Sequence, residues 1–248
     1  MPAMNSSTQT GAALFFDVLV DLQVDYLFGH TGGAVIPLHV ELNKRMKRQQ
    51  RSPRFVLFRQ EGGAGHAAEG YARASGRVGV ALATSGPGAT NLTTPIADAH
   101  KDSIPTVFIT GQVPSFAIGT DAFQEVDTVG VTRPISKHNY LVKEAGDLEW
   151  VLREAFALAA HGRPGPVVVD ICKDAQLKAV GEQRPARLRH REPVAFDARK
   201  ANAILAALAA AERPVIKAGG GIIHAGASQA LCRLAERFDA PVTTTFNA

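Results

Sequence analysis

Short apolar stretches alternate with amphipathic helical stretches along the first 175 residues, and this alternation limits the possible folds more than any other feature. Strands are predicted at residues 26–29, 55–58, 78–83, 105–110 and 166–171, and helices at 12–22, 33–47, 61–75, 85–99 and 148–160. Strands that are apolar on both faces and separated by helices are typical of a parallel sheet covered on both sides. The sequence therefore predicts an α/β fold with a doubly wound parallel sheet, and we expect all these strands to be buried.

A second α/β unit is predicted after a polar, basic stretch at residues 173–193. Its helices are expected at 198–211 and 227–238, and its strands at 215–217 and 241–245. The predicted organisation is a loose tail (1–10), a sheet domain (11–175), a linker (176–195) and the start of a second domain (196–248). Because two strands are too few for an independent doubly wound domain, we expect the chain to stop within that domain.

Composition excludes several classes of protein. No apolar run reaches the roughly 18 residues of a membrane helix, and the first ten residues lack the basic and apolar regions of a signal peptide. Cys172 and Cys232 have no cysteine or paired histidines nearby, so we expect no disulfide framework and no metal ligands in this chain. These features favour a cytoplasmic protein that does not bind membranes.

The net charge is +4, with basic clusters at residues 44–54 and 184–191. Neither cluster has the interleaved aromatic residues or the recognisable module of a nucleic-acid-binding site. We therefore interpret both clusters as solvated surface and expect no nucleic-acid partner.

Candidate site residues follow the predicted strands. Ligands of doubly wound sheets bind beyond the carboxyl ends of the strands, where we place Gly32-Gly33, Glu61, residues 85–88 and Gln112. The glycine-rich turn at 85–88 could receive an anion at a helix start, but close packing of helix on sheet is the better interpretation. The stretch from 112 to 140 is too long for an idle connection and is predicted to be a functional loop.

Several motifs occur in a characteristic order along the chain. They are GHTGGAVIPLH, EGGAGHAAEGYARASG, TSGPGATNL, DSIPTVFITGQVP, GTDAFQEVD, VTRPISKHNYLV and GRPGPVVVDICKD. Together they resemble the amino-terminal part of the thiamine diphosphate-dependent acetohydroxyacid synthase (acetolactate synthase) family. The resemblance implies a pyrimidine-binding domain followed by the start of a central domain.

The resemblance also implies an activity. The complete enzyme would decarboxylate pyruvate and transfer the two-carbon unit to a second 2-oxo acid, in branched-chain amino acid biosynthesis. It would act as a homodimer or tetramer, and a regulatory subunit could accompany it.

Glu61 is the central candidate. The resemblance makes it the catalytic glutamate that hydrogen-bonds N1′ of the cofactor's aminopyrimidine and so activates the cofactor. A poorly solvated carboxylate has a raised proton affinity, which suits sharing a proton with that ring nitrogen. The alternative is a first-turn residue that only complements the helix dipole.

Other site residues follow from the resemblance alone. Gly33 would bring backbone near the thiazolium and substrate, although Gly32-Gly33 also suits a tight turn. Gln124 would reach the cofactor and the substrate pocket, with Phe123 beside it; alternatively, Phe123 is anchored in the core. Lys137 and Lys173 match positions at the mouth of the substrate channel.

The resemblance implies two further cofactors. FAD would contact Ser103, Arg163 and the glycines Gly219, Gly220 and Gly221, although Arg163 could equally be a surface turn residue. Mg²⁺ would need the oxygen ligands of a Gly-Asp-Gly motif and a downstream Asn. That motif is absent from this sequence, so we expect the Mg²⁺ ligands to lie outside this chain and the isolated chain to be inactive. The second half of the cofactor site would come from a neighbouring subunit.

Two departures from the family pattern leave alternatives open. His30-Thr31 stands where the family has Tyr-Pro, and Phe246-Asn247 where it has Leu-Met. One alternative is another thiamine diphosphate-dependent carboligase, decarboxylase or oxidase, for instance one acting on glyoxylate. Another is a non-catalytic chain that serves as a binding or assembly module.

Overall fold

The computed structural model describes residues 9–181 and 195–247, and its contacts divide the chain into two units, residues 1–191 and 192–248. The basic cluster at 184–191 and most of the expected linker lie outside the described residues, as does the expected tail up to residue 8. Gln9 and Thr10 are part of the first unit, because Thr10 caps the first helix and its backbone bridges to Ala179.

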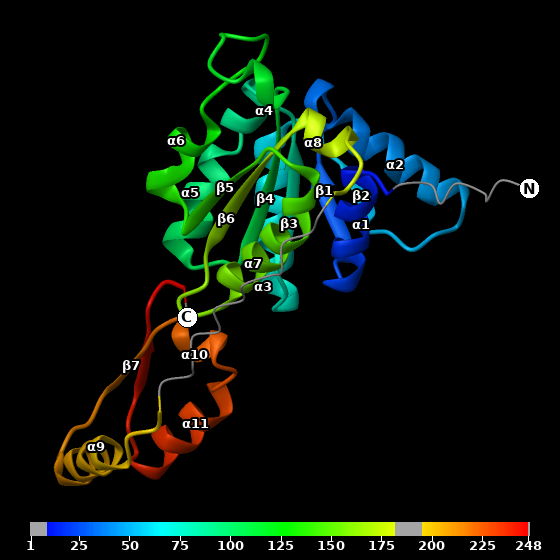
Figure 1. The fold of residues 1–248 in the computed structure, drawn as a ribbon. Helices are drawn as coiled ribbons and strands as arrows, with labels where there is room; N and C mark the ends of the chain where they lie inside the picture. The colour runs from blue at the N-terminus through cyan, green and yellow to red at the C-terminus, as the bar shows by residue number, and fades with distance from the viewer. Residues whose placement is uncertain (1–8, 182–194, 248) are drawn as a thin grey trace, which may run out of the picture. The chain divides into compact units, whose positions relative to one another are not determined.

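The first unit is built on a six-stranded sheet in the order β2-β1-β3-β4-β6-β5 (Figure 1). Every strand pairs in parallel with its neighbours, which confirms the predicted doubly wound fold. The chain order reverses between β1 and β3, and the crevice at such a point is where doubly wound sheets bind ligands. The strands are β1 Tyr26–Gly29, β2 Arg54–Leu57, β3 Gly79–Ala83, β4 Thr106–Gln112, β5 His138–Val142 and β6 Pro166–Cys172.

Helices cover both faces of this sheet. Side chains alternate along β4, so that Val107 and Ile109 join the core under α1, α2 and α7, while Phe108 joins the core under α3 and α5. The helices are α1 Gly11–Asp21, α2 Ile36–Lys47, α3 Glu61–Ser75, α4 Pro87–Thr90, α5 Thr93–Asp102, α6 Thr128–Thr132, α7 Leu148–Ala160 and α8 Lys173–Leu177.

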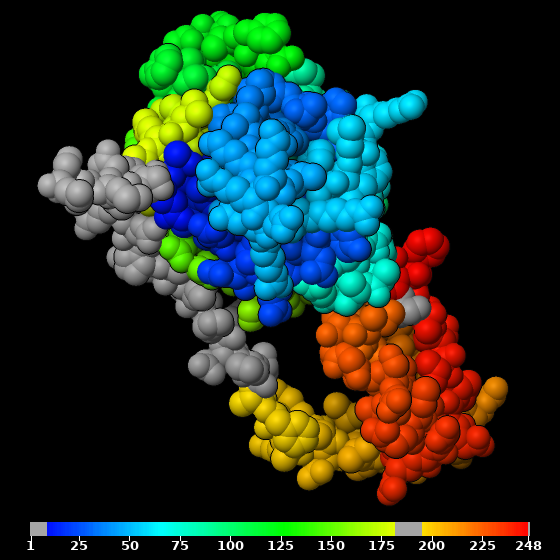
Figure 2. Space-filling view, turned by 90° about the vertical axis from the view of Figure 1, so that its right-hand side faces the viewer, coloured from blue at the N-terminus to red at the C-terminus, as the bar shows by residue number. Residues whose placement is uncertain are grey.

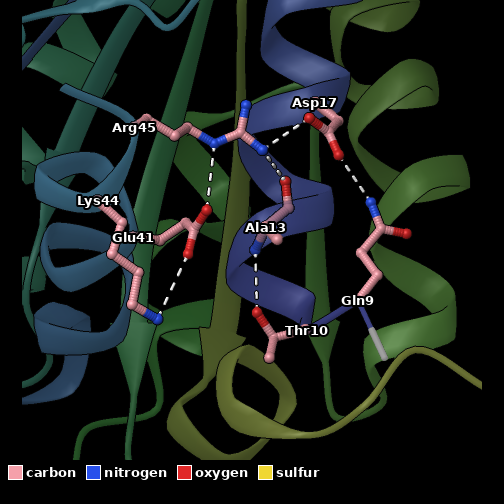
Figure 3. Close-up of polar contacts among 7 residues, drawn as sticks. All are labelled: Gln9, Thr10, Ala13, Asp17, Glu41, Lys44 and Arg45. Carbon is pink, nitrogen blue, oxygen red and sulfur yellow. Dashed lines mark hydrogen bonds and ion pairs between the residues drawn. The ribbon is translucent and has the colours of Figure 1, made fainter. Parts of the chain in front are cut away.

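A buried arginine joins two of these helices (Figure 3). Arg45 of α2 donates from Nη2 to Asp17 Oδ1 at 2.6 Å and to the Ala13 carbonyl at 2.9 Å, both on α1. Its Nε lies 3.4 Å from Glu41 Oε1, and its guanidinium lies over the Phe16 ring at 5.7 Å. The pair of helices that precedes and follows β1 is thereby held together.

The structure differs from the sequence prediction in four elements. The strand expected at 55–58 is an edge strand with partly exposed residues, because β2 has a neighbour on one side only. The stretch 112–140 contains α6 and β5, so the irregular loop is shorter than expected. The helix expected at 85–99 is broken into α4 and α5, and α8 occupies the start of the expected linker.

The second unit, described by itself, pairs β7 Ile216–Ala218 in parallel with β8 Val242–Thr244. Its helices are α9 Ala198–Ala210, α10 Gly221–His224 and α11 Ser228–Arg237. Among the described residues of either unit, no helix combines the length and the hydropathy needed to cross a membrane.

Candidate functional site

Five of the candidate positions meet at one edge of the sheet. Gly33 follows β1, Glu61 follows β2, Gln112 ends β4, Lys173 follows β6, and Gln124 lies on the loop after β4. All strands are parallel, so their carboxyl ends share this edge, which carries α8 and the loop in Figure 1. The structure therefore gathers residues that are far apart in the sequence.

Glu61 is held at the first position of α3. The side chain of Gln60 caps this helix by accepting from the Gly63 N–H at 2.8 Å, so that the helix begins where β2 ends. Glu61 is only 9% exposed, and its Oε2 accepts a hydrogen bond from Asn91 Nδ2 at 2.9 Å. The carboxyl group is thus buried and held in one orientation by Asn91.

Glycines pack closely against Thr84, which follows β3, and one of them also lies next to Glu61. A Cβ at Gly88 would lie 2.7 Å from Thr84 Cγ2 and 3.4 Å from Glu61 Oε1. A Cβ at Gly32 would lie 2.4 Å from Thr84 Cβ, whereas one at Gly33 would meet nothing within 4 Å. Thr84 Oγ1 also accepts from the Ala34 N–H at 3.1 Å. Backbone and small side chains are therefore closely packed where β1 and β3 end, whereas Gly33 faces open space.

The loop after β4 brings Gln124 next to Gly86, which lies just after β3. Gly86 has φ +57°, and a Cβ there would lie 2.6 Å from the Gln124 carbonyl oxygen. Gln124 itself has φ +59°, a conformation that non-glycine residues seldom adopt and that often marks a functional site. Phe123 is 88% exposed, so the interpretation of Phe123 as a core anchor is wrong. Figure 2 shows this green segment at the surface of the first unit.

Carboxylates hold the loop in place. Asp174 of α8 accepts from the Ser115 N–H and hydroxyl at 2.9 and 2.7 Å. Burial raises the pKa of Asp174, but hydrogen bonds from Ser115 and Lys178 outweigh it and lower that pKa to about 2. Glu125 accepts from the Gly119 N–H and, at 3.1 Å, from the Ala122 N–H, and these backbone bonds lower its pKa. The tip of the loop is therefore ordered by its own side chains.

Three candidate residues lie at the opposite edge. Ser103, Lys137 and Arg163 each come shortly before a strand, β4, β5 and β6 respectively. Arg163 Nε donates to Ser103 Oγ at 2.7 Å, and its Nη2 donates to the Lys101 carbonyl at 3.0 Å at the end of α5. The structure brings Ser103 and Arg163 together but not with Glu61.

Lys137 hydrogen-bonds to backbone carbonyls at the end of α7. Its Nζ donates to the His161 carbonyl at 2.8 Å and also to the Leu158 carbonyl, and burial lowers the pKa of this amine. Within this chain Lys137 therefore caps a helix at the amino edge, and a role at the substrate channel stays a prediction.

The glycines Gly219, Gly220 and Gly221 connect β7 to α10 in the second unit. A Cβ at Gly220 would lie 2.8 Å from the Asn247 carbonyl oxygen, whereas one at Gly221 would meet nothing within 4 Å. This turn is therefore tight on one side and open on the other.

The sequence prediction missed two polar residues of the site region. Asn91, the partner of Glu61, lies within the motif TSGPGATNL but was given no role. Asp170 is buried in β6, and the sequence signal for it is an acidic residue inside the apolar run VVVDIC.

A group of potential metal ligands, His66, Glu69 and Asp98, lies on α3 and α5, where His66 Nδ1 is 2.7 Å from Glu69 Oε2.

Comparison with known families identifies both units. Residues 9–131 match the family described as "Thiamine pyrophosphate enzyme, N-terminal TPP binding domain". Residues 201–248 match "Thiamine pyrophosphate enzyme, central domain". Thiamine pyrophosphate is another name for thiamine diphosphate.

Individual acetolactate synthases are similar to this chain over almost its whole length. The chain is 49% identical over 245 residues to acetolactate synthase large subunit IlvB1 of Mycobacterium tuberculosis, covering 96% of this chain and 38% of that protein. It is 48% identical over 242 residues to the acetolactate synthase large subunit of Corynebacterium glutamicum, covering 96% and 38%. It is 43% identical over 247 residues to the mitochondrial acetolactate synthase catalytic subunit of Saccharomyces cerevisiae, covering 95% and 35%. The chain thus spans well under half the length of these relatives.

A solved structure shares the fold. An X-ray structure of a candidate thiamin diphosphate-dependent enzyme from Mycobacterium smegmatis superposes with a TM-score of 0.83 at 24% identity. The match covers 96% of this chain and 44% of that chain.

Proposed function

The chain belongs to the thiamine pyrophosphate enzymes, and from this premise we propose that it forms the amino-terminal part of an acetolactate synthase-like enzyme. The complete protein would decarboxylate pyruvate and join the two-carbon unit to a second 2-oxo acid. The near-complete coverage of this chain by acetolactate synthases supports that choice within the family.

The observation that carries the proposal is the buried, oriented carboxyl group of Glu61 at the carboxyl edge of the sheet. Its Oε2 is already bound by Asn91, so its Oε1, next to Gly88, is the oxygen available to a ligand. A carboxyl group in such a place can hydrogen-bond a ring nitrogen and hold or release a proton there. We assign Glu61 the role of binding N1′ of the aminopyrimidine.

Gly33 opens to free space at the same edge of the sheet, where a Cβ would meet nothing within 4 Å, and this supports placing a ligand beside it. When bound, thiamine diphosphate supplies the carbon nucleophile that attacks the carbonyl of a 2-oxo acid. Gly33 would offer backbone polar groups beside the reacting centre. Gln124 would donate from its side-chain amide, and Phe123 and Lys173 would line the approach of an anionic substrate.

The proposal extends to further components. Mg²⁺ would be bound by residues outside this chain. FAD would be a further cofactor, with Ser103 and Arg163 as its candidate ligands in the first unit and Gly219, Gly220 and Gly221 as candidates in the second. A second protomer would complete the cofactor site, in a homodimer or tetramer, and a regulatory subunit could bind in addition. We also propose that the complete enzyme acts in the cytoplasm.

A second candidate, another 2-oxo acid as the main substrate, is favoured by His30. Its Nδ1 lies 2.6 Å from the Phe58 carbonyl oxygen, so Nδ1 carries the proton of the neutral ring. This contact holds the ring of His30, which stands where the family has Tyr, next to the segment that leads to Glu61. Assays of the full-length protein with pyruvate, glyoxylate and longer 2-oxo acids discriminate the two, because absence of acetolactate from pyruvate would favour the second.

The main test is Glu61→Gln in the full-length protein. We expect acetolactate formation to fall by about a hundredfold or more, with an unchanged circular dichroism spectrum and thermal midpoint. Glu69→Gln is the matched control, since Glu69 is also a buried glutamate of α3 but is bound to His66. Near-normal activity of the Glu61 variant would refute the assignment.

A further inference from the structure

Asp170 is a buried carboxyl group that the proposed reaction does not use. It lies in β6 with 1% of its surface exposed, opposite Thr110 of β4. Thr110 Oγ1 donates to its Oδ1 at 2.7 Å, and Gln112 Nε2 donates to its Oδ2 at 2.8 Å. Burying a carboxyl group costs free energy, so we expect Asp170 to have a specific role.

Gln112 connects Asp170 to the loop. The same Nε2 donates to the Val126 carbonyl at 2.9 Å, and its Oε1 accepts from the Val113 N–H at 2.9 Å. These contacts fix which end of the amide is the donor, because the Val113 N–H can only donate and the Val126 carbonyl can only accept. Rotation of the amide by half a turn would break both of these hydrogen bonds.

The hydrogen-bonded bridge from Asp170 through Gln112 ends at the Val126 carbonyl, two residues after Gln124. On its other side Gln124 packs against Gly86, so the residue is held between Gly86 and the bound Val126 carbonyl. The start of the loop is bound separately, by Asp174, and its tip by Glu125. The Asp170–Gln112 bridge therefore links the end of the loop to β6, where the Thr128 side chain also faces Asp170.

We propose that Asp170 is a positioning residue that acts through Gln112 and Val126 to keep Gln124 at the carboxyl edge beside Glu61. The inference rests on the proposed function only in giving Gln124 a task; the mechanical link is independent of it. Burial raises the pKa of Asp170 to about 7, with Asp127 acting in the same direction, so both protonation states are accessible. Either state can accept from Gln112, and the bridge does not require the charge.

Three variants of the full-length protein test this link. Asp170→Ala removes both acceptors, whereas Asp170→Asn can present its carbonyl to Gln112 and its amide to the Thr110 hydroxyl. Gln112→Met cuts the bridge and leaves the acid free to become neutral, which protects the test against misfolding of the alanine variant. Thr106→Val is the control, because Thr106 is another buried threonine of β4 whose hydroxyl lies toward Ile104 at the opposite edge.

The first readout is amide hydrogen exchange, which does not depend on activity. We expect exchange at residues 119–128 to rise about tenfold in Asp170→Ala and Gln112→Met, while β3 and β4 stay protected and Asp170→Asn and Thr106→Val match the wild type. Loop exchange unchanged in both bridge variants, or raised equally in the strands, would overturn the proposal.

The second readout is kinetic. We expect kcat/KM for the 2-oxo acid to fall about tenfold in the bridge variants, with recovery in Asp170→Asn and little change in the KM for thiamine diphosphate. A rise in loop exchange without activity in any variant, wild type included, would reject the proposed function and leave the positioning link intact.

Discussion

Gly86→Ala tests whether the place of Gln124 matters. Gly86 has φ +57° and ψ −118°, a conformation open to glycine, and forcing alanine into such backbone costs about 1–3 kcal/mol. The new Cβ would also lie 2.6 Å from the Gln124 carbonyl oxygen and 2.9 Å from its Cα. Both are backbone atoms, so the loop must move by close to an ångström to restore ordinary contact.

The expected result follows from these two costs. Strain of this size leaves a domain of ordinary stability, about 5–15 kcal/mol, folded. A shift of about 1 Å at a reacting centre can lower the rate about a hundredfold, so we expect kcat/KM for pyruvate to fall by that order.

The matched control is Gly76→Ala. Gly76 ends α3 with φ +70°, and a Cβ there would meet nothing within 4 Å. Gly76→Ala should lower the free energy of unfolding by about 1–2 kcal/mol because of the left-handed backbone alone, and it should not displace the loop. Urea unfolding and steady-state kinetics of both full-length variants give the comparison. Equal activities would refute the argument that Gly86 sets the position of Gln124.

Two further predictions concern stability. Arg45→Met should lower the free energy of unfolding in urea by about 1–3 kcal/mol, because it removes a buried guanidinium with its hydrogen bonds to the Ala13 carbonyl, to Glu41 and to the half-exposed Asp17. Arg153→Met, which loses Asp21 and Glu149 at a more exposed site, should cost under about 1 kcal/mol, and equal losses would contradict the role of burial. Asp170 has a raised folded pKa, so its contribution to stability is full below about pH 4 and is lost as pH rises towards 7. The unfolding free energy of Asp170→Asn should therefore fall less between pH 4 and 7 than that of the wild type, and parallel curves would show that Asp170 does not titrate there.

The sequence predicted best those elements that carry their own start and stop signals. The helix over Glu61–Ser75 has the predicted bounds because Gln60 caps its start and the left-handed Gly76 ends it. Each of the four strands β1, β3, β4 and β6 has a neighbouring strand on both sides, and their apolar runs can be recognised from the sequence alone.

The elements that were missed depend on contacts distant in sequence. β5 is an edge strand with mixed burial, so its sequence lacks a continuous apolar run. α8 spans only Lys173–Leu177 and is stabilised by Gln176, whose Nε2 donates to the Ala34 carbonyl at 2.9 Å. Short polar helices of this kind are decided by tertiary packing rather than by local propensity.

The candidate site shows the same division. Gly33, Glu61 and Gln112 were expected to lie together because they follow parallel strands, and the structure brings them to one edge. Gln124 was expected there from the family resemblance alone. Asn91 and Asp170 could not be assigned from sequence, because their roles depend on which side chains face them across the fold.

The two edges of the sheet also limit what one ligand can contact. β4 runs from Thr106 to Gln112, and at about 3.3 Å per residue its ends lie roughly 20 Å apart. Ser103 and Arg163 lie at the amino end of the strands, whereas Glu61 and Gln112 lie at the carboxyl end. A cofactor that binds Glu61 therefore cannot reach Arg163 of the same sheet. If both groups of residues bind ligands, they bind two separate molecules, and removing the guanidinium of Arg163 should leave the affinity for thiamine diphosphate unchanged.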